Sequence, residues 1–451
     1  MNKIISITIT VAIAVAIAFS TISCKPLHSS TATNEHVDKV LTEQTQQYVA
    51  WRRVFNDTLL VQLIDTALAH NADLSTASLN VLQAEASLRA SRLSLLPTAV
   101  IGAEGSFSKA NGMSPNTAYN LPVTMQWEWN FGGKHRSEQQ LAIADYHNAA
   151  EIQKSVLVQL VAAIASHYYT LVMMDRQLAV TRLAIENAHH TMEVMQTLKQ
   201  YGMQNEAAVS QARAEWLRIT ASEQDILQQI INTENALSTL VGQRQDCICR
   251  TAMDSVSISI DYTRSFPLEC LAERPDVKAA EYALMSQMAQ VGIARSAFYP
   301  SLSISASAGW TNNLGDIINP GKILFNALAS IVQPLFSKGQ NRANLDIATA
   351  QQEQALVAFN QALLVAGTEL NDALAACRIG DERLLLRRQE AEASWRAYEV
   401  SQVLMNNTSN TYLEVLTAQS AWLQSQLSLA SDWLDKVQAQ INLYKALGGN
   451  Y

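Results

Sequence analysis

The chain has no glycine and no proline between His135 and Tyr201, a stretch of 67 residues. These two residue types interrupt or end most helices, so their absence predicts a single helix over the whole stretch. With a rise of 1.5 Å per residue, such a helix would reach about 100 Å. A compact globule cannot enclose a helix of that length. The stretch therefore predicts a coiled coil, a tube or a long repeat.

Charged residues are also scarce, at 16% of the 451 residues, and the formal net charge is -8. No stretch of the chain forms the basic stripe that neutralises nucleic-acid phosphates, which excludes nucleic acid as a partner. Ala, Ser, Gln and Asn fill the helix faces where Lys and Glu are usual. Uncharged polar faces suit contact with other protein or the lining of an aqueous passage.

Motifs of catalysis are absent from the sequence. It contains no Gly-rich phosphate loop, nucleophile elbow or HExxH motif. His189, His190 and Glu193 come closest to a metal pair, but they fall on the polar face of the long predicted helix, where solvated side chains are expected. We therefore predict no enzyme, no catalytic residue, no metal site and no cofactor.

The five cysteines fit no zinc-binding pattern, because the two close ones have no matching second pair. Cys270 can form a disulfide with Cys247 or Cys249 in an oxidising compartment, or all of them remain thiols. The sequence leaves this choice open.

The N-terminus carries a targeting signal. Lys3 is followed by an apolar run from Ile4 to Phe19, which is short for a membrane span and typical of a secretory signal peptide over residues 1–23. Cys24 follows small residues and resembles a bacterial lipoprotein processing site, at which the cysteine carries acyl chains, although Thr21 stands where Leu is usual. The alternative is an ordinary signal peptide with a passenger cysteine.

The apolar period changes from helical to alternating after Pro97, which predicts two strands at about 98–131. The second strand alternates most cleanly. Its apolar positions are Leu121, Val123, Met125, Trp127, Trp129 and Phe131.

The whole succession of helix, strands, long helix and returning helix then occurs again. Three landmarks recur at offsets of 203, 205 and 206 residues, which indicates an internal duplication. The paired landmarks are Arg89 to Pro97 with Gly292 to Pro300, Phe131 to Lys134 with Phe336 to Gly339, and Val209 to Leu217 with Val415 to Leu423.

These patterns predict two structural repeats. They are preceded by an N-terminal segment at 24–57, which ends by packing around Trp51 and Phe55. The first repeat spans 58–242, with its long helix at 135–201 and its returning helix at 205–241. A linker at 243–266 follows, with a short strand at 256–260. The second repeat spans 267–451, with strands at about 301–335, a long helix at 338–404 and a returning helix at 411–447.

The strands have the length and alternation of membrane strands. Four strands cannot close, and an open sheet edge in lipid would leave its backbone groups without partners. Two copies would give eight strands, a lumen filled by side chains, whereas three copies give twelve strands and an aqueous lumen. We therefore predict a homotrimer. Its fold class is mainly α with a membrane β part: a long antiparallel α-helical coiled-coil barrel joined to a 12-stranded trimeric transmembrane β-barrel.

Trp127, Trp129 and Trp310 fall on the apolar side of their predicted strands. This position suits an aromatic girdle at the membrane interface, where one side of an indole ring contacts acyl chains and the other contacts water and headgroups. The alternative is that the three rings face the core of a soluble sandwich.

A run of motifs in the second repeat resembles the signature of the TolC-type outer membrane efflux proteins, and more closely their lipoprotein branch. The resemblance covers nearly all of residues 58 to 449. The motifs are Arg274-Pro275-Asp276-Val277, Ala280-Glu281, Gly292-Ile293-Ala294-Arg295 and Phe298-Tyr299-Pro300-Ser301-Leu302.

The resemblance implies a trimeric exit duct in the bacterial outer membrane with a large periplasmic helical part. It implies partnership with a periplasmic adaptor (a membrane fusion protein) and an inner membrane transporter of the resistance-nodulation-division type, which supplies the energy for multidrug efflux. It also implies a gate at the periplasmic end of the helices. The family's gating carboxylates fall on Glu414 and Thr417, beside a turn that includes Asn410.

One alternative function stays open: a lipid-anchored periplasmic coiled-coil lipoprotein without a pore. It accounts for the helices and for Cys24, but not for four amphipathic strands.

Overall fold

The structure is a computed structural model, and it describes residues 51–108, 116–243, 248–256, 258, 260–262, 269–311, 323–406 and 412–449. All of them belong to one compact unit, which begins at Tyr48. The predictions for the signal peptide, Cys24, Cys247 and Asn410 lie outside the described residues.

Helices dominate this unit, and each repeat contributes one very long helix. In the first repeat they are α3 (Trp51–Val54), α4 (Thr58–His70), α5 (Ala72–Leu93), α6 (Lys134–Gln200) and α7 (Glu206–Val241). The 3-10 helix η2 (Met253–Ser255) follows. The second repeat has α8 (Glu269–Ala272), α9 (Pro275–Ser296), α10 (Gln340–Asn406) and α11 (Tyr412–Ala446).

In each repeat, the helical segment that precedes the strands is divided into two helices. Asn71 separates α4 from α5: its Oδ1 accepts from the amide of Leu74 at 2.9 Å, and its Nδ2 donates to the carbonyl of Leu240 on α7 at 2.9 Å. Asn71 thus caps α5 and joins its start to the end of α7. In the second repeat, Arg274 and Pro275 separate α8 from α9, with Pro at the first helical position.

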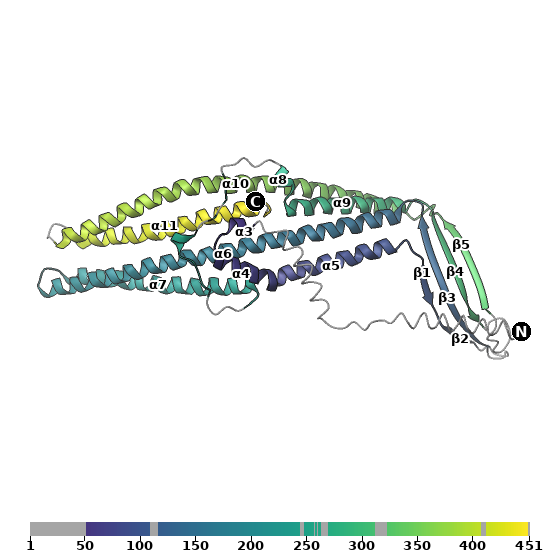
Figure 1. Ribbon diagram of the computed structural model, residues 1–451, viewed down its shortest axis with the longest axis horizontal. Coiled ribbons are helices and arrows are strands. Elements are labelled where there is room, and N and C mark those ends of the chain that lie inside the picture. The colour runs from purple at the N-terminus through teal and green to yellow at the C-terminus, as the bar shows by residue number, and fades with distance from the viewer. Residues whose placement is uncertain are drawn as a thin grey trace. The chain divides into compact units, whose positions relative to one another are not determined.

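Each long helix lies beside two shorter helices that follow one another (Figure 1). Towards the strands, contacts run from α5 to α6, from α6 to α9 and from α9 to α10. At the other end, α6 packs on α7, α10 packs on α11, and α11 also contacts α6. α6 contains a window apolar and long enough to cross a membrane, but 61% of that window is buried against its neighbours. It is therefore the central helix of the bundle.

The strands form one antiparallel sheet in the order β1, β3, β4, β5, with β2 also paired to β3 (Figure 1). Their bounds are β1 Thr98–Ile101, β2 Glu104–Ser108, β3 Asn116–Asn130, β4 Ser301–Thr311 and β5 Ile323–Val332.

β1 and β2 are two parts of one ribbon, because both pair with β3 in a single register. The interruption lies opposite Pro122, which has no amide proton for the ladder. Pro122 also pairs with Gly309 on β4, where a Cβ would come within 2.7 Å of the Cα of Pro122. A glycine is needed there to let the proline lie inside the sheet.

The register places most of the apolar side chains of the strands on one face. Residues directly opposite in antiparallel strands share a face. Trp127 pairs with Ile304, and Ile304 pairs with Ala329. The opposite face carries the Ser, Thr, Gln and Glu positions, with Val100 on β1 and Leu328 and Val332 on β5 as exceptions. The predicted two-faced sheet is present in the fold.

The middle of the helical part is held by the linker and by a buried arginine. Within the predicted strand at 256–260, Ile258 forms an antiparallel bridge with the buried Phe55. Arg274 is 3% exposed and donates to Glu369 on α10 at 2.6 Å and to the carbonyl of Ala446 on α11 at 3.1 Å. It thereby joins the start of α9 to the end of α11.

Candidate functional site

The site most relevant to passage through the protein lies at the tip, which we define as the end of the helices away from the strands. There α6 turns into α7 at Tyr201–Asn205, with Gly202 in the left-handed region at φ 71°. The Oδ1 of Asn205 accepts from the amide of Ala208 at 3.0 Å and so caps α7. α10 and α11 approach the tip beside this turn (Figure 1).

Two apolar clusters hold the two helix pairs together near the tip. In the outer cluster, Leu416 of α11 packs against Met192 and Met195 of α6 and against Ala208, Val209 and Ala212 of α7. The second cluster draws on all four helices. Its buried members are Val180, Ala184, Ala188, Ile219, Tyr398, Val415, Trp422 and Leu423.

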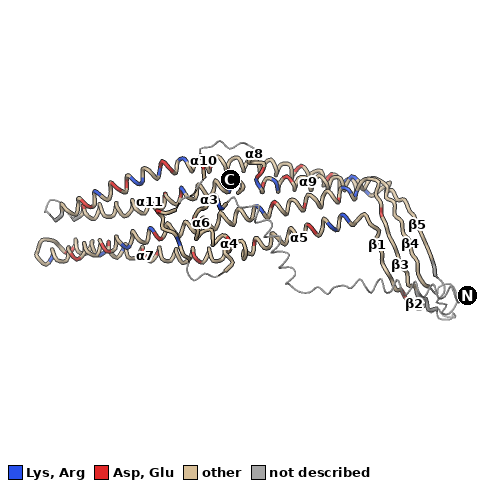
Figure 2. The backbone as a smooth tube through the Cα atoms, viewed as in Figure 1, with Lys and Arg blue, Asp and Glu red and all other residues tan. Residues whose placement is uncertain are grey.

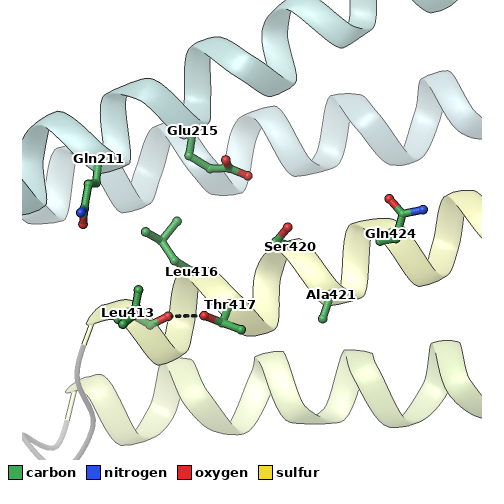
Figure 3. A pocket seen from close by; sticks show the side chains of 8 residues that line it. All are labelled: Gln211, Glu215, Leu413, Leu416, Thr417, Ser420, Ala421 and Gln424. Carbon is green, nitrogen blue, oxygen red and sulfur yellow. Dashed lines mark hydrogen bonds between the residues drawn. The ribbon is translucent and has the colours of Figure 1, made fainter.

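A groove of about 560 Å³ separates α7 from α11 beside these clusters (Figure 3). Its walls are equivalent parts of the two repeats: Gln211 and Glu215 on α7 correspond to Thr417 and Ala421 on α11, at the offset of 206 residues. The remaining lining residues are Leu413, Leu416, Ser420 and Gln424. The groove therefore opens where the returning helices of the two repeats face each other.

The groove is polar but carries little net charge. Glu215 contributes a carboxylate, which Arg218 of the same helix neutralises through hydrogen bonds of 2.8 and 2.5 Å. Hydrogen bonding to Glu215 raises the pKa of Arg218. The hydroxyl of Thr417 donates to the carbonyl of Leu413 at 2.8 Å (Figure 3). Thr417 therefore lines the groove with a hydroxyl group whose proton is already used in a hydrogen bond.

The two predicted gate residues that the structure describes, Glu414 and Thr417, lie one helical turn apart at the start of α11. Thr417 lines the groove, whereas Glu414 is exposed in the first turn of α11 and is not part of the groove wall. Asn410 lies outside the described residues. Sequence reasoning missed Gln211 and Glu215, although the repeat alignment already paired them with Thr417 and Ala421.

A buried glutamine lies on α11 beside the second cluster. Gln419 is 1% exposed, and among the described residues neither its Oε1 nor its Nε2 has a hydrogen-bond partner. It is one helical turn from Val415 and Trp422, which belong to the second cluster. An unsatisfied buried amide is unfavourable, so the packing of α11 is weaker at this position than with an apolar side chain.

The sheet places the three predicted girdle tryptophans at its two ends. Trp127 and Trp129 lie near the helices, with ring centroids 5.9 Å apart. Trp310 pairs with Leu121 towards the other end. Eight residues of β3 separate the levels of Leu121 and Trp129, about 27 Å along a strand. This is the scale of the apolar band of a membrane barrel.

The histidines noted in the sequence lie on the surface of α6. His189 contacts the ring of Trp216 at 5.3 Å between centroids, and its Nδ1 is 3.7 Å from Glu193. Within the part of the chain that the structure describes, no three His, Cys, Asp or Glu side chains form a group that could hold a metal ion.

Comparison with known proteins gives one consistent result. The family model described as "Outer membrane efflux protein" matches residues 63–243 and 267–449, which are the two repeats. The toluene efflux pump outer membrane protein TtgF of Pseudomonas putida is 29% identical over 413 residues, which cover 89% of this chain and 85% of that protein. The cation efflux system protein CusC of Escherichia coli is 27% identical over 414 residues, which cover 90% of this chain and 89% of that protein.

Solved structures of such channels superpose on the fold. The crystal structure of CusC matches with a TM-score of 0.82 at 25% identity and covers 88% of this chain and 94% of that one. The open state of the MtrE outer membrane channel of Neisseria gonorrhoeae matches with a TM-score of 0.79 at 26% identity, with coverages of 89% and 91%.

Proposed function

The chain belongs to the outer membrane efflux protein family and is an outer membrane channel of an efflux system, and we propose that it works as a trimeric exit duct gated at its tip. The helical part is periplasmic and the sheet lies in the outer membrane. The duct conducts passively, because the chain has no motif for a reaction that would supply energy.

One observation carries the trimer: the sheet has two open ends. β1 with β2 forms one edge and β5 the other, and the ladder does not close within the described residues of one chain. Lipid offers no hydrogen bonds to such edges. Three copies arranged head to tail pair each β5 with the β1–β2 ribbon of the next copy and give a barrel wide enough for water.

The apolar face of this sheet then contacts lipid, and the serine-rich face lines the lumen. Trp127, Trp129 and Trp310 form the two aromatic girdles. Exposed apolar residues of α10, among them Val357, Leu364 and Leu386, become contacts between copies. The same three-fold arrangement continues the barrel into a helical tube.

We propose that the tip closes the duct by the packing of the two helix pairs. Leu416 and the two apolar clusters hold the pairs together, and separation along the groove between α7 and α11 widens the passage. Three copies of Glu414, with Thr417 and Asn410 nearby, give a narrow electronegative opening that favours cations. Gln419, with its unsatisfied buried amide, weakens the packing of α11 and lowers the free energy needed for this movement.

Opening is driven by assembly with other proteins. We propose a periplasmic adaptor and an inner membrane transporter of the resistance-nodulation-division type as partners. The adaptor docks helices at the tip, where exposed Leu413 and the groove are accessible. The names of the relatives include toluene in one case and cations in another. Selection of the exported compounds therefore lies mainly with the transporter.

The remaining sequence predictions complete the proposal. Residues 1–23 direct export, and lipid on Cys24 anchors the N-terminal segment at 24–57. Residues 58–242 and 267–451 are the two structural repeats, joined by a linker at 243–266.

Purification from membranes tests this function. We expect a detergent-extracted, heat-labile trimer with mixed α and β circular dichroism, which forms conducting channels in planar bilayers. A Cys24→Ala variant that is released without detergent as a helical, non-conducting monomer would instead establish the lipoprotein spacer.

A further inference from the structure

Four connections join the helices to the strands, and each of them carries at least one basic residue. We call them the junctions and define them as residues 86–103, 129–137, 282–303 and 333–345. Together they contain seven Lys or Arg, and acidic residues stand directly beside their bounds, at Glu85, Glu104, Glu128, Glu138, Glu281 and Asp346. The seven are Arg89, Arg92, Lys134, Arg136, Arg295, Lys338 and Arg342. We call them the basic collar.

The four junctions lie at one level of the fold. The amide of Phe131 donates to the carbonyl of Pro300 at 3.2 Å, which joins the second junction to the third. The Nδ2 of Asn341 donates to the carbonyl of Ala297 at 3.1 Å and joins the fourth to the third. The first junction is joined to β3 by a hydrogen bond of 3.0 Å from the Nε1 of Trp127 to the carbonyl of Leu95. Figure 2 colours the backbone blue at Lys and Arg, and blue positions occur near the strand end of the helices. Residues far apart in the sequence thus form one band.

Helix stability does not explain the collar. Arg92 and Arg295 lie in the last turns of α5 and α9, where a cation is favourable. Lys134, Arg136 and Arg342 lie instead in the first turns of α6 and α10, where the helix dipole disfavours positive charge and where neither helix has an acidic residue.

Lys338 adds a second unfavourable feature. It has φ 53°, in the left-handed region, at the position that the first repeat fills with Gly133 at φ 74°. A lysine is costly in this conformation, and a glycine would avoid the cost.

Internal ion pairs do not account for the collar either. Arg89 pairs with Glu85, and Lys134 lies about 4 Å from Glu128 and Glu138. The other five form no salt bridge with any residue that the structure describes. They are Arg92, Arg136, Arg295, Lys338 and Arg342.

A band of exposed apolar side chains accompanies the collar on the side of the strands. Its members are between 42% and 92% exposed. They are Leu93, Leu95, Leu96, Phe131, Phe298, Tyr299, Leu335 and Phe336. Apolar side chains next to basic ones, at the level of Trp127 and Trp129, match the border between acyl chains and headgroups.

From this juxtaposition we infer that the basic collar binds anionic phospholipid headgroups of the periplasmic leaflet. The apolar band enters the acyl region, and the guanidinium and ammonium groups extend to the phosphates. The lipid phosphates supply the negative charge that the first turns of α6 and α10 lack. The inference rests on the proposed orientation in the outer membrane. Beyond that orientation, the collar would make the channel select anionic lipids and would fix the depth at which it inserts in the membrane.

Tryptophan quenching by brominated lipids tests this binding directly, because Trp127 and Trp129 lie at the collar. The full-length trimer, with Trp310→Phe to remove the distal reporter, is reconstituted in mixtures of phosphatidylethanolamine and phosphatidylglycerol. Either lipid carries the bromine. We expect phosphatidylglycerol to be enriched about fivefold at the reporters, the factor for one extra charge contact per lipid.

Two matched sets of five substitutions separate the collar from net charge. The collar set should abolish the enrichment, and the control set, on exposed arginines of the periplasmic helices, should retain it. The collar set is Arg92→Gln, Arg136→Gln, Arg295→Gln, Lys338→Gln and Arg342→Gln. The control set is Arg176→Gln, Arg213→Gln, Arg378→Gln, Arg388→Gln and Arg396→Gln.

Equal quenching by the two lipids in the parent protein, or enrichment that persists in the collar set, would overturn the inference. If the collar set does not assemble, Lys338→Gln with Arg342→Gln should reduce the enrichment by at least about half. Conductance recorded from the same preparation separates the two proposals. A channel that conducts without lipid preference refutes only the collar, whereas a protein that does not conduct refutes the duct.

Discussion

The indole Nε1 of Trp127 donates a hydrogen bond of 3.0 Å to the backbone carbonyl of Leu95. This bond links the C-terminal end of β3 to the connection between α5 and β1. It therefore fixes the ring where the helices end and the strands begin. Trp129 lies against it on the same face of the sheet. The sheet and the helices therefore share one rigid border, and the face that holds these rings determines which side chains meet lipid.

Adjacent positions on β3 test this assignment of faces. Met125 belongs to the apolar face and Gln126 to the other. Met125→Arg should prevent membrane assembly, because a charge on the lipid face near mid-height costs about 2–4 kcal/mol. Gln126→Arg should assemble normally, since it faces water in the lumen. Heat-labile trimers in membrane fractions provide the measurement, and equal yields would show that the faces are assigned wrongly.

A second prediction concerns the carboxylate near the opening. Glu414→Ala should raise single-channel conductance several-fold or admit large antibiotics such as vancomycin, because it removes three charges from the narrowest point. Glu392→Ala, an exposed acid on α10, is the matched control. Unchanged conductance and unchanged antibiotic sensitivity would remove Glu414 from the gate.

Leu416 should hold the closed state. It is the contact of α11 with the outer cluster formed by α6 and α7. Leu416→Ala removes apolar contacts worth about 1–2 kcal/mol and should raise the fraction of open time roughly tenfold. Val403→Ala, on an exposed face of α10, should leave gating as it is. Planar bilayer recordings at matched voltage decide, and a closed fraction unaffected by Leu416→Ala would exclude this contact from closure.

Gln419 predicts a gain of stability. Replacement by Leu removes an unsatisfied buried amide and should stabilise the helical part by about 1–3 kcal/mol. The exposed Gln424→Leu on the same helix should have no such effect. Thermal unfolding by circular dichroism measures both, and a lower midpoint for Gln419→Leu would mean that the amide has partners in the assembled protein.

Arg274 also donates to the two carboxylate oxygens of Asp276, at 3.0 and 2.7 Å. This ion pair predicts that the stability of the fold depends on pH. Burial alone would raise the pKa of Asp276, but the hydrogen bonds and charge of Arg274 bring it below its ordinary value. A carboxylate with a lowered pKa stabilises the fold above about pH 4, and this contribution is lost as the pH falls through the folded-state pKa. Asp276→Asn should therefore lower the unfolding midpoint at pH 7, and the difference from the parent should shrink towards pH 3. A difference independent of pH would contradict this role.

Much of the fold was predictable because its signals are local. The absence of Gly and Pro predicts α6, the internal duplication predicts α10 although it contains Gly367 and Gly380, and the alternation after Pro97 and Pro300 predicts the strands and their faces. Two features depended on distant contacts. The apolar period runs straight through Asn71, and the break there relies on its bond to Leu240. Pro122 inside a central strand requires Gly309 from the other repeat.

The candidate site was less predictable than the fold. Resemblance located Glu414 and Thr417, but only the rotation of α11 against α7 shows that Thr417 faces the groove and that Glu414 does not. The repeat alignment pairs Glu215 with Ala421, but the sequence does not show which face of α7 carries Glu215. The basic collar is dispersed over four segments, so composition along the chain does not detect it.

Electron cryomicroscopy of the detergent-purified full-length protein tests the central claim most directly. We predict three chains around a three-fold axis, with β5 of each beside the β1–β2 ribbon of the next and an open lumen through the barrel. Single molecules, or a sheet that closes on itself within one chain, would contradict the account.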